Sequence, residues 1–205
     1  MNTDWLNWLL IPTSYLIGSM AWGLLVVRAT TKVDVRTTGS GKTGATNVLR
    51  AAGKWAALVV LLADFGKGLG VVLLARWTGD DSTLHAAAAS AVIAGHVWPV
   101  LAGFRGGRGI ATGFGATIGI DPIAAVVALL VFVPVVGATR YVSLGSVLSV
   151  LSAVAALGIK AAFLDAPVQY VGYGIICGTL IVYMHRDNIQ RLAHGTERRL
   201  GRPAK

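Results

Sequence analysis

The sequence contains little charge and almost no cysteine. Only 13% of its 205 residues are Asp, Glu, Lys or Arg, whereas about a quarter of a soluble domain is charged, so the composition excludes an ordinary soluble globular enzyme. The single cysteine, Cys177, excludes an internal disulfide and a cysteine-based zinc site. Because Cys177 lies in an apolar run, we expect it to serve in packing.

Acidic residues are scarce as well, and this scarcity leaves two interpretations of the net charge. There are 9 Asp and Glu against 18 Lys and Arg, which gives a net charge of +9. In a soluble protein this excess would indicate nucleic acid binding. In a membrane protein it reflects the Lys and Arg of the cytoplasmic loops. The mean hydropathy of +0.67 favours a membrane protein, and the positions of the cations decide between the two.

Long hydrophobic runs are what the sequence has in abundance. A transmembrane helix needs about 20 mostly apolar residues. Five charge-poor runs of about that length occupy residues 5–27, 55–77, 84–103, 141–164 and 167–184. The first run follows Asp4 instead of a cationic flank and has no small-residue cleavage site, so we predict a retained span and not a signal peptide.

The region 109–138 is too long for one simple span. Asp121-Pro122 interrupts it, and a proline after an aspartate predicts a turn followed by a new helix. We expect residues 109–120 to form a short, broken or re-entrant helix, which is tolerated only where protein shields it. The prediction is an all-α polytopic integral membrane protein with about seven transmembrane helices. No internal repeat or second domain is visible, so residues 1–205 are predicted to be a single membrane-embedded domain.

The cations gather on one side of this topology. With the N-terminus outside and the C-terminus in the cytoplasm, 15 of the 18 Lys and Arg lie on the inner face, as the positive-inside rule requires. These are Arg28, Lys32, Arg36, Lys42, Arg50, Lys54, Arg105, Arg108, Arg140, Arg186, Arg191, Arg198, Arg199, Arg202 and Lys205. Asp4, Asp80, Asp81, Asp121 and Asp165 fall outside. The charge therefore indicates a lipid bilayer and no nucleic acid partner.

The first inner loop is rich in glycine, hydroxyl, amide and cationic side chains. Its candidate anion-binding residues are Gly39, Ser40, Gly41, Lys42, Thr46, Asn47 and Arg50, a composition suited to a backbone concavity for phosphate. The fragment Gly-Ser-Gly-Lys-Thr is not a P-loop, because Arg36 stands where the Walker pattern requires glycine. The alternative is a flexible glycine linker in a topology-setting loop.

The second inner segment places two arginines around a glycine pair, Arg105, Gly106, Gly107 and Arg108, before a short helix. Guanidinium groups and the N–H groups of a helix N-terminus both suit an anion. The alternative is that the arginines set topology and the glycines allow close helix packing. His96, inside the preceding span, is either a helix contact or a functional ionisable group.

Three further sets of polar residues remain. Asp64 and Lys67 share a helix face at a spacing of three residues. They form either an internal ion pair or, through Lys67, the support of an anion site. Ser143 follows Arg140, the cation of the third inner loop, and His185 and Asn188 lie where the last span leaves the membrane. No group of Cys, His and carboxylate residues has the spacing of metal ligands.

These motifs resemble the bacterial acyl-phosphate:glycerol-3-phosphate acyltransferase family (PlsY), over nearly the whole chain. The resemblance is carried by residues 17–19, 39–41, 44–50 and 95–96, by Asp64 with Lys67-Gly68, by Pro99-Val100, by Phe104 with the glycines at 106, 107 and 109, and by residues 185–190. It implies a seven-helix enzyme that moves an acyl chain from acyl phosphate to the 1-hydroxyl of glycerol 3-phosphate. The products would be lysophosphatidic acid and inorganic phosphate, without a cofactor.

The resemblance also implies roles for residues. Ser40, Lys42, Arg50, Arg105 and Arg108 would bind phosphate, while His185 and Asn188 would hold glycerol 3-phosphate. His96 would orient or deprotonate the attacking hydroxyl, unless a substrate phosphate is the base.

The sequence departs from the family at Lys42, usually Asn, at Arg105 and Arg108, usually Lys, and at Met20-Ala21, usually Ile-Pro. Arginine keeps the charge of lysine but changes the donor geometry, so a diverged paralogue with another anionic acceptor is an alternative.

Two other functions compete. A small transporter or channel for an anionic solute is suggested by Asp64, Lys67 and His96, but it predicts polar residues along several spans and an inverted repeat, and the sequence has neither. A thioester-dependent acyltransferase with a His-x4-Asp pair is disfavoured, since no histidine has Asp five residues later.

Overall fold

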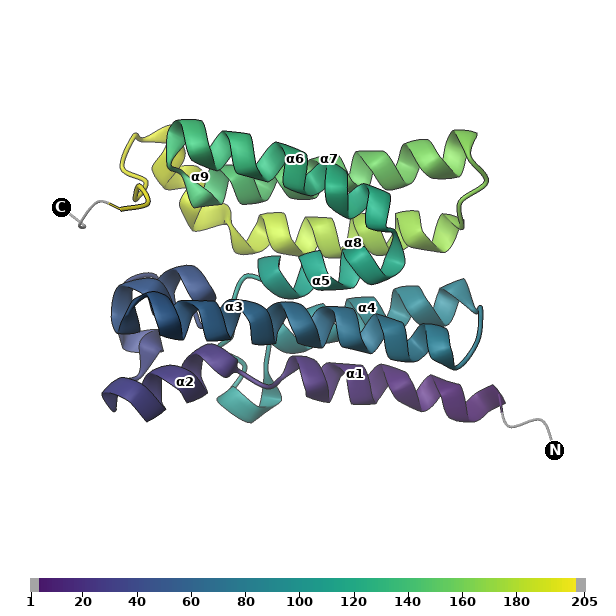
Figure 1. Cartoon of the computed structure of the whole chain (residues 1–205), viewed down its shortest axis with the longest axis horizontal. Helices are drawn as coiled ribbons and strands as arrows, with labels where there is room; N and C mark the ends of the chain where they lie inside the picture. Colours follow the sequence, from purple (N-terminus) through teal and green to yellow (C-terminus); the bar gives the residue numbers. More distant parts are fainter. Residues whose placement is uncertain (1–3, 202–205) are drawn as a thin grey trace. The chain divides into compact units, whose positions relative to one another are not determined.

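The structure, a computed structural model, describes residues 4–201, and every regular element in this range is a helix. The chain divides into two compact units, residues 1–120 and 121–205, which are described separately (Figure 1). Arg202 and Lys205, which the sequence assigns to the inner tail, lie outside the described residues. The all-helical prediction is confirmed.

In its described part, residues 4–120, the first unit contains five α-helices and three short 3-10 helices. In chain order these are η1 (Asp4–Leu9), α1 (Leu10–Gly18), α2 (Trp22–Thr31), η2 (Val35–Thr37), α3 (Ala45–Trp77), α4 (Ser82–Val97), η3 (Val100–Ala102) and α5 (Ile110–Ile120). Helix α3 packs on α2, α4 and α5, and α1 packs on α4. The core under the first loop includes Val27, Val35, Val48 and Val60, all fully buried.

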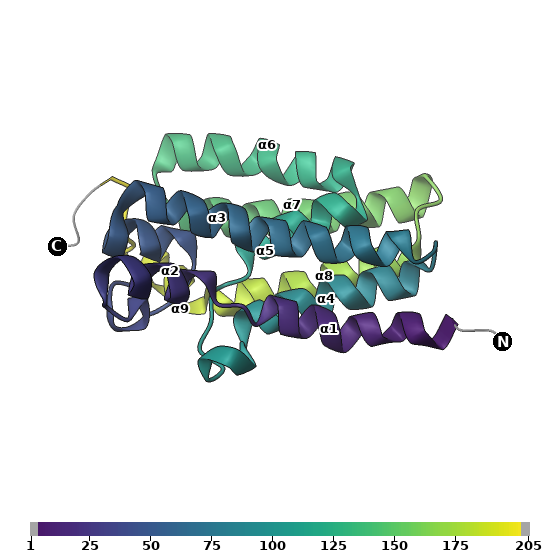
Figure 2. The ribbon, with the colours of Figure 1, turned by 60° about the horizontal axis from the view of Figure 1, so that its bottom comes forward.

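The first predicted span is broken. Figure 2 shows α1 and α2 as separate helices joined by a short link, where the sequence predicts one continuous run. Lys67 of α3 occupies the break: its Nζ donates to the carbonyls of Gly18 and Met20, each at 3.0 Å. The apolar pattern does not reveal the break, because the donor comes from a helix about fifty residues further along.

Helix α3 is kinked where the sequence places the start of a span. Gly53 has a φ of +82° inside the helix, a left-handed value that glycine adopts at little cost. The predicted apolar run 55–77 is the part after the kink. Arg50, predicted in the inner loop, lies in the short helical segment before the kink.

Glycines bring the helices of this unit into close contact. A Cβ on Gly18 would lie 2.2 Å from the carbonyl oxygen of Val92, and one on Gly95 would lie 2.1 Å from that of Tyr15, so α1 and α4 touch backbone to backbone. Gly68 faces the carbonyl of Thr112 in the same way and brings α3 against α5. Small residues at crossings are typical of packed membrane helices.

The second unit contains α6 (Pro122–Thr139), α7 (Val142–Phe163), α8 (Val168–Met184) and α9 (Arg186–Ala193). Asp121 caps α6 by accepting from Ala124 N at 2.9 Å, which confirms the predicted turn and new helix at Asp121-Pro122. Helix α7 packs on both α6 and α8 (Figure 1). Helix α9 turns away from α8 by 57°.

Five helical segments in residues 4–201 are long and apolar enough to cross a membrane. The number rises to six if the bent pair α8 and α9 is counted as one span. The five are Leu6–Thr31, Ala45–Trp77, Ser82–Ala102, Pro122–Thr139 and Val142–Phe163. The eleven residues of α5 reach only about 16 Å, too short for a hydrocarbon core of about 30 Å. Arg76 donates to the carbonyl of Gly119 at 2.8 Å, so protein satisfies the end of this short helix.

Candidate active site

The glycine-rich first loop is organised from within by Asn47. Its Nδ2 donates to the carbonyls of Val35, Thr38 and Lys42 at 3.0, 3.1 and 2.9 Å, and its Oδ1 accepts from Ser40 N at 3.0 Å. Asn47 is buried. The sequence makes Asn47 a candidate phosphate-binding residue. These four contacts instead give its amide a structural task, because it replaces the hydrogen bonds that an irregular loop lacks.

Some backbone N–H groups of the same loop form hydrogen bonds within the loop region. The N–H of Ser40 is taken by Asn47, and the N–H of Gly41 donates to Thr38 O at 2.9 Å. Gly39 and Gly41 have φ values of +52° and +67°, which other residues rarely adopt. The N–H groups at positions 40 and 41 are therefore not free to form the expected anion-binding concavity. Gly39 and Gly41 instead allow the backbone to turn with positive φ values.

The side chains proposed for phosphate lie around this folded loop. Ser40 and Lys42 are half-buried in the loop, Thr46 is half-buried in the first turn of α3, and Arg50 is exposed one turn further on. The loop and the first turns of α3 thus place the two proposed cations, Lys42 and Arg50, within eleven residues of the two proposed hydroxyls, Ser40 and Thr46.

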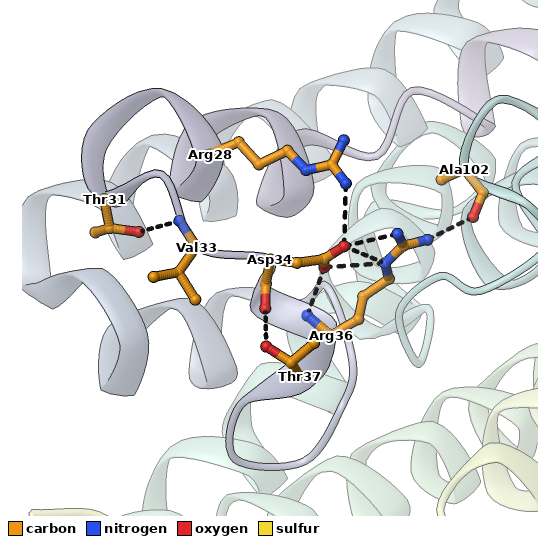
Figure 3. A network of polar contacts seen from close by, with 7 residues as sticks. All are labelled: Arg28, Thr31, Val33, Asp34, Arg36, Thr37 and Ala102. Atoms are coloured by element: carbon orange, nitrogen blue, oxygen red, sulfur yellow. Dashed lines mark hydrogen bonds and ion pairs between the residues drawn. The ribbon is translucent and has the colours of Figure 1, made fainter.

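Asp34 and Arg36 form a clasp at the base of the loop (Figure 3). Arg36 donates to the Asp34 carboxylate through Nη2 at 2.7 Å and through Nε at 3.0 Å, and Arg28 of α2 reaches the same carboxylate at 3.1 Å. The side-chain hydrogen bond from Arg36 holds the pKa of Asp34 well below its usual range, with Arg28 adding to the effect. Arg36 also donates to the carbonyl of Ala102 at 2.8 Å.

His96 belongs to a buried cluster of charged groups on α3 and α4. Lys67 Nζ lies 2.8 Å from Asp64 Oδ1, and His96 Nδ1 lies 3.4 Å from the same oxygen. Of the two alternatives for Asp64 and Lys67, the structure shows the internal ion pair. Lys67 directs its donors to Asp64 and to two carbonyls of the α1–α2 break, so its ammonium acts on protein groups.

The second segment folds back onto His96. The N–H of Gly107 donates to His96 O at 3.1 Å, and a Cβ on Gly107 would lie 2.0 Å from His96 Nε2. A Cβ on Gly106 would lie 2.0 Å from His96 O. Glycine is required at both positions by close approach, and Arg105 and Arg108 flank the pair, exposed and half-buried respectively.

In the second unit, one carboxylate gathers the polar groups. Glu197 Oε1 accepts from Ser143 Oγ at 2.9 Å and from Asn188 Nδ2 at 2.7 Å, and Oε2 accepts from Arg191 Nε at 2.7 Å. Its side chain is only 6% exposed. No motif in the sequence marks Glu197 as a site residue.

Asn188 and His185 are fixed in orientation. Because Asn188 Nδ2 donates to Glu197, the amide oxygen is assigned, and this Oδ1 is buried without a hydrogen-bond partner among residues 4–201. His185 Nδ1 lies 2.8 Å from Ile181 O. A carbonyl only accepts, so Nδ1 carries the proton. An unpaired buried acceptor is costly and therefore indicates a donor supplied by a ligand or water.

Sequence reasoning missed three residues of these sites: Asp34, Arg36 and Glu197. One signal was available, since Glu197 is the only glutamate in the chain. Among residues 4–201 no group of three His, Cys, Asp or Glu side chains could hold a metal ion.

The model of the family described as glycerol-3-phosphate acyltransferase matches residues 8–195. The chain belongs to this family. A glycerol-3-phosphate acyltransferase of Halalkalibacterium halodurans is 44% identical, covering 96% of this chain and 97% of its own length. One of Geobacter sulfurreducens is 40% identical, covering 93% and 96%.

Two solved structures are also similar. Both are of PlsY (YgiH), an integral membrane glycerol 3-phosphate acyltransferase, in its glycerol 3-phosphate form and its lysophosphatidic acid form. The first has a TM-score of 0.89 at 38% identity, covering 95% of this chain and 96% of the other. The second has a TM-score of 0.85 at 37% identity, covering 95% of each. Membership in this family makes the chain a membrane acyltransferase.

Proposed function

We propose that this protein transfers a fatty acyl group from acyl phosphate to the 1-hydroxyl of sn-glycerol 3-phosphate, giving lysophosphatidic acid and inorganic phosphate. The hydroxyl oxygen bonds to the acyl carbon, the bond from that carbon to the phosphate oxygen breaks, and phosphate leaves with the electron pair. Acyl phosphate is a mixed anhydride with a good leaving group, so no covalent protein nucleophile is needed. Catalysis then consists of positioning two phosphates and stabilising charge.

The cationic side chains of the first unit supply the anion binding in this proposal. Lys42 and Arg50 with the hydroxyls of Ser40 and Thr46 bind phosphate at the first loop. Arg105 and Arg108 do so beside Gly106 and Gly107, where guanidinium groups offer paired donors. Asn47 and Lys67 contribute by holding the loop and the α1–α2 break.

His96 has two possible tasks in the reaction, and its contacts bear on both. With Nδ1 directed at Asp64, Nε2 is the basic nitrogen, and it lies against Gly107. We propose that His96 orients the second segment and takes up the hydroxyl proton through Nε2, with a substrate phosphate as the competing base. Replacement of His96 by Ala without loss of turnover in a folded protein would remove it from the mechanism.

The unpaired oxygen of Asn188 is the observation that carries the acceptor assignment. A buried amide oxygen with its Nδ2 already committed to Glu197 needs a donor, and a glycerol hydroxyl is one. Ser143 and His185 complete the proposed glycerol 3-phosphate contacts in this unit.

A matched pair of variants on α9 tests this assignment. Asn188→Ala should raise the KM for glycerol 3-phosphate about tenfold or more, the value of a hydrogen bond in a buried site, while the KM for acyl phosphate stays within twofold. Gln190→Ala, at an exposed position of the same helix, is the control and should change neither. Equal effects of Asn188→Ala on both KM values would refute the assignment.

The reaction itself is tested with purified protein, acyl phosphate and glycerol 3-phosphate. Release of phosphate should depend on the acceptor and yield lysophosphatidic acid, and acyl-CoA should not replace the donor. Phosphate release that does not depend on the acceptor would instead favour the alternative function, a transporter or channel for an anionic solute.

The proposed topology is a single membrane-embedded domain of seven helices in the bacterial plasma membrane, with α5 as the short one. The N-terminus is outside and the C-terminus is cytoplasmic, which leaves the phosphate-binding loops facing the cytoplasm. Support comes from the positions of the charges. The cations of the first two inner loops lie around the start of α3 and beyond the end of α4, whereas Asp80 and Asp81 lie between the end of α3 and the start of α4. In a Cys177→Ala background, a membrane-impermeant thiol reagent added to whole cells should label Thr83→Cys and spare Thr37→Cys.

A further inference from the structure

The two segments of the first unit that are proposed to bind phosphate are far apart in sequence, yet one side chain links their bases. Arg36 leads into the first loop and donates through Nη1 to the carbonyl of Ala102 at 2.8 Å (Figure 3). Ala102 is buried at the end of η3. The residues after it, Gly103 and Phe104, have φ values of +63° and +59° and lead directly to Arg105.

Arg36 is held rigidly enough to act as a strut. Its Nη2 and Nε both donate to the Asp34 carboxylate, and its own backbone N–H donates to Asp34 Oδ1 at 2.9 Å. The Arg36 side chain is only 19% exposed. A guanidinium that is fixed on one edge by a carboxylate presents its remaining donor in a defined direction, and here that donor meets Ala102.

We propose that Arg36, oriented by Asp34, is a positioning residue that sets the separation between the first phosphate-binding loop and the Arg105–Arg108 segment. This inference rests on the proposed function, which assigns phosphate binding to both segments. A reaction between two anionic substrates depends on the spacing of their binding groups, because misplacement by about 1 Å can lower the rate about 100-fold. The clasp acts through the loops and touches neither substrate.

The structure supplies a matched control in Arg28. Arg28 pairs with the same carboxylate as Arg36, at 3.1 Å, but its side chain is 56% exposed and comes from α2. Arg28 donates to Asp34, whereas Arg36 donates both to Asp34 and to the carbonyl of Ala102. Lysine at position 36 keeps the charge and can pair with Asp34, but it lacks the fork that serves Asp34 and Ala102 together.

The kinetic test compares Arg36→Lys with Arg28→Lys. Arg36→Lys should lower kcat about 30- to 100-fold, with a smaller change in the KM of either substrate, while its melting temperature in detergent stays near that of the parent. Arg28→Lys should retain kcat within about twofold. Equal losses in the two variants, or a loss in Arg36→Lys that follows the unfolded fraction alone, would overturn the proposal.

A distance measurement tests the strut without any turnover. Spin labels at Thr37→Cys and Phe104→Cys, in a Cys177→Ala background, report the separation of the two segments. The distribution should be narrow in the parent and with Arg28→Lys, and broad with Arg36→Lys. A narrow distribution in Arg36→Lys overturns the proposal, as does a broad one with unchanged kcat.

The two measurements separate the strut from the proposed function. If the parent protein has no acyltransferase activity, the proposed function fails, whereas the distance distribution still reports on the strut. If Arg36→Lys does not fold, Asp34→Asn takes its place, because it removes the anchor of the guanidinium. Asp34→Asn with a narrow distribution and full kcat would likewise overturn the inference.

Discussion

The two units both use a buried carboxylate to organise polar groups, but they do so over different distances in the sequence. Asp64 pairs with Lys67 three residues away on the same helix and with His96 on the neighbouring α4. Glu197 gathers Ser143, Asn188 and Arg191, which lie 54, 9 and 6 residues from it. We call each carboxylate with its partners a hub. The Asp64 hub lies within packed helices, and the carboxylate of the Glu197 hub lies in the chain that follows α9.

The difference shows which buried sites can be recognised in a sequence. A pair at i and i+3 in an apolar span stands out, because a charge there needs a partner nearby. A hub such as Glu197 sits in a polar tail where charge is ordinary, so only the fold reveals its burial. Removal of each carboxylate therefore tests the two sites separately. The free energy of unfolding should fall more when Asp64 loses its charge than when Glu197 does.

The largest effect is expected for Asp64→Asn. It leaves the Lys67 ammonium buried against carbonyls alone, so the free energy of unfolding should fall by about 3–5 kcal/mol. The double variant Asp64→Asn with Lys67→Met removes both charges and should lose less than the single one. Denaturant unfolding in detergent, followed by tryptophan fluorescence, measures both. An equal loss in the single and double variants would mean that the pair is not coupled.

For Glu197→Gln we expect a smaller loss, about 3 kcal/mol at most, because hydrogen bonds to a charged group contribute about 1.5–3 kcal/mol each and the amide keeps one acceptor. The KM for glycerol 3-phosphate should rise with it, since the Asn188 amide is no longer held. Arg191→Gln removes one of the three contacts and is the control with the milder change. If Arg191→Gln matched Glu197→Gln in both readouts, the ion pair alone would account for the hub.

The fold was largely predictable because the apolar runs are long and their interruptions are chemically distinct. The predicted runs 141–164 and 167–184 coincide with α7 and α8 within a residue, and Asp121-Pro122 marks the start of α6. The break after Gly18 was not predictable, since it depends on Lys67 from a distant helix. The sequence indicated the glycine-rich loop, but not that Asn47 occupies its interior.

Close approach of backbone to side chain gives the next prediction, for Gly107→Ala in the first unit. The added Cβ would lie 2.0 Å from His96 Nε2, so the ring or the segment must move, at a cost of about 2 kcal/mol. Turnover should fall about tenfold or more. Gly66→Ala, where a Cβ meets nothing within 4 Å, is the control in the same assay. Wild-type turnover in Gly107→Ala would show that the His96 position is not critical.

The smallest effect is expected for the pH dependence of folding stability at low pH. It arises at the Asp34 clasp, where the charges are partly exposed, in contrast to both buried hubs. Arg36 lowers the pKa of Asp34 in the folded protein, so the clasp contributes its full stability above the ordinary Asp pKa of about 4. That contribution is lost as the pH falls below 4 towards the lowered folded pKa, because the unfolded chain takes up the proton first. Asp34→Asn should remove this part of the pH dependence, by no more than about 1 kcal/mol for a pair that solvent partly screens. Melting temperatures from pH 6 to pH 2.5 measure it, and parallel curves for the two proteins would contradict it.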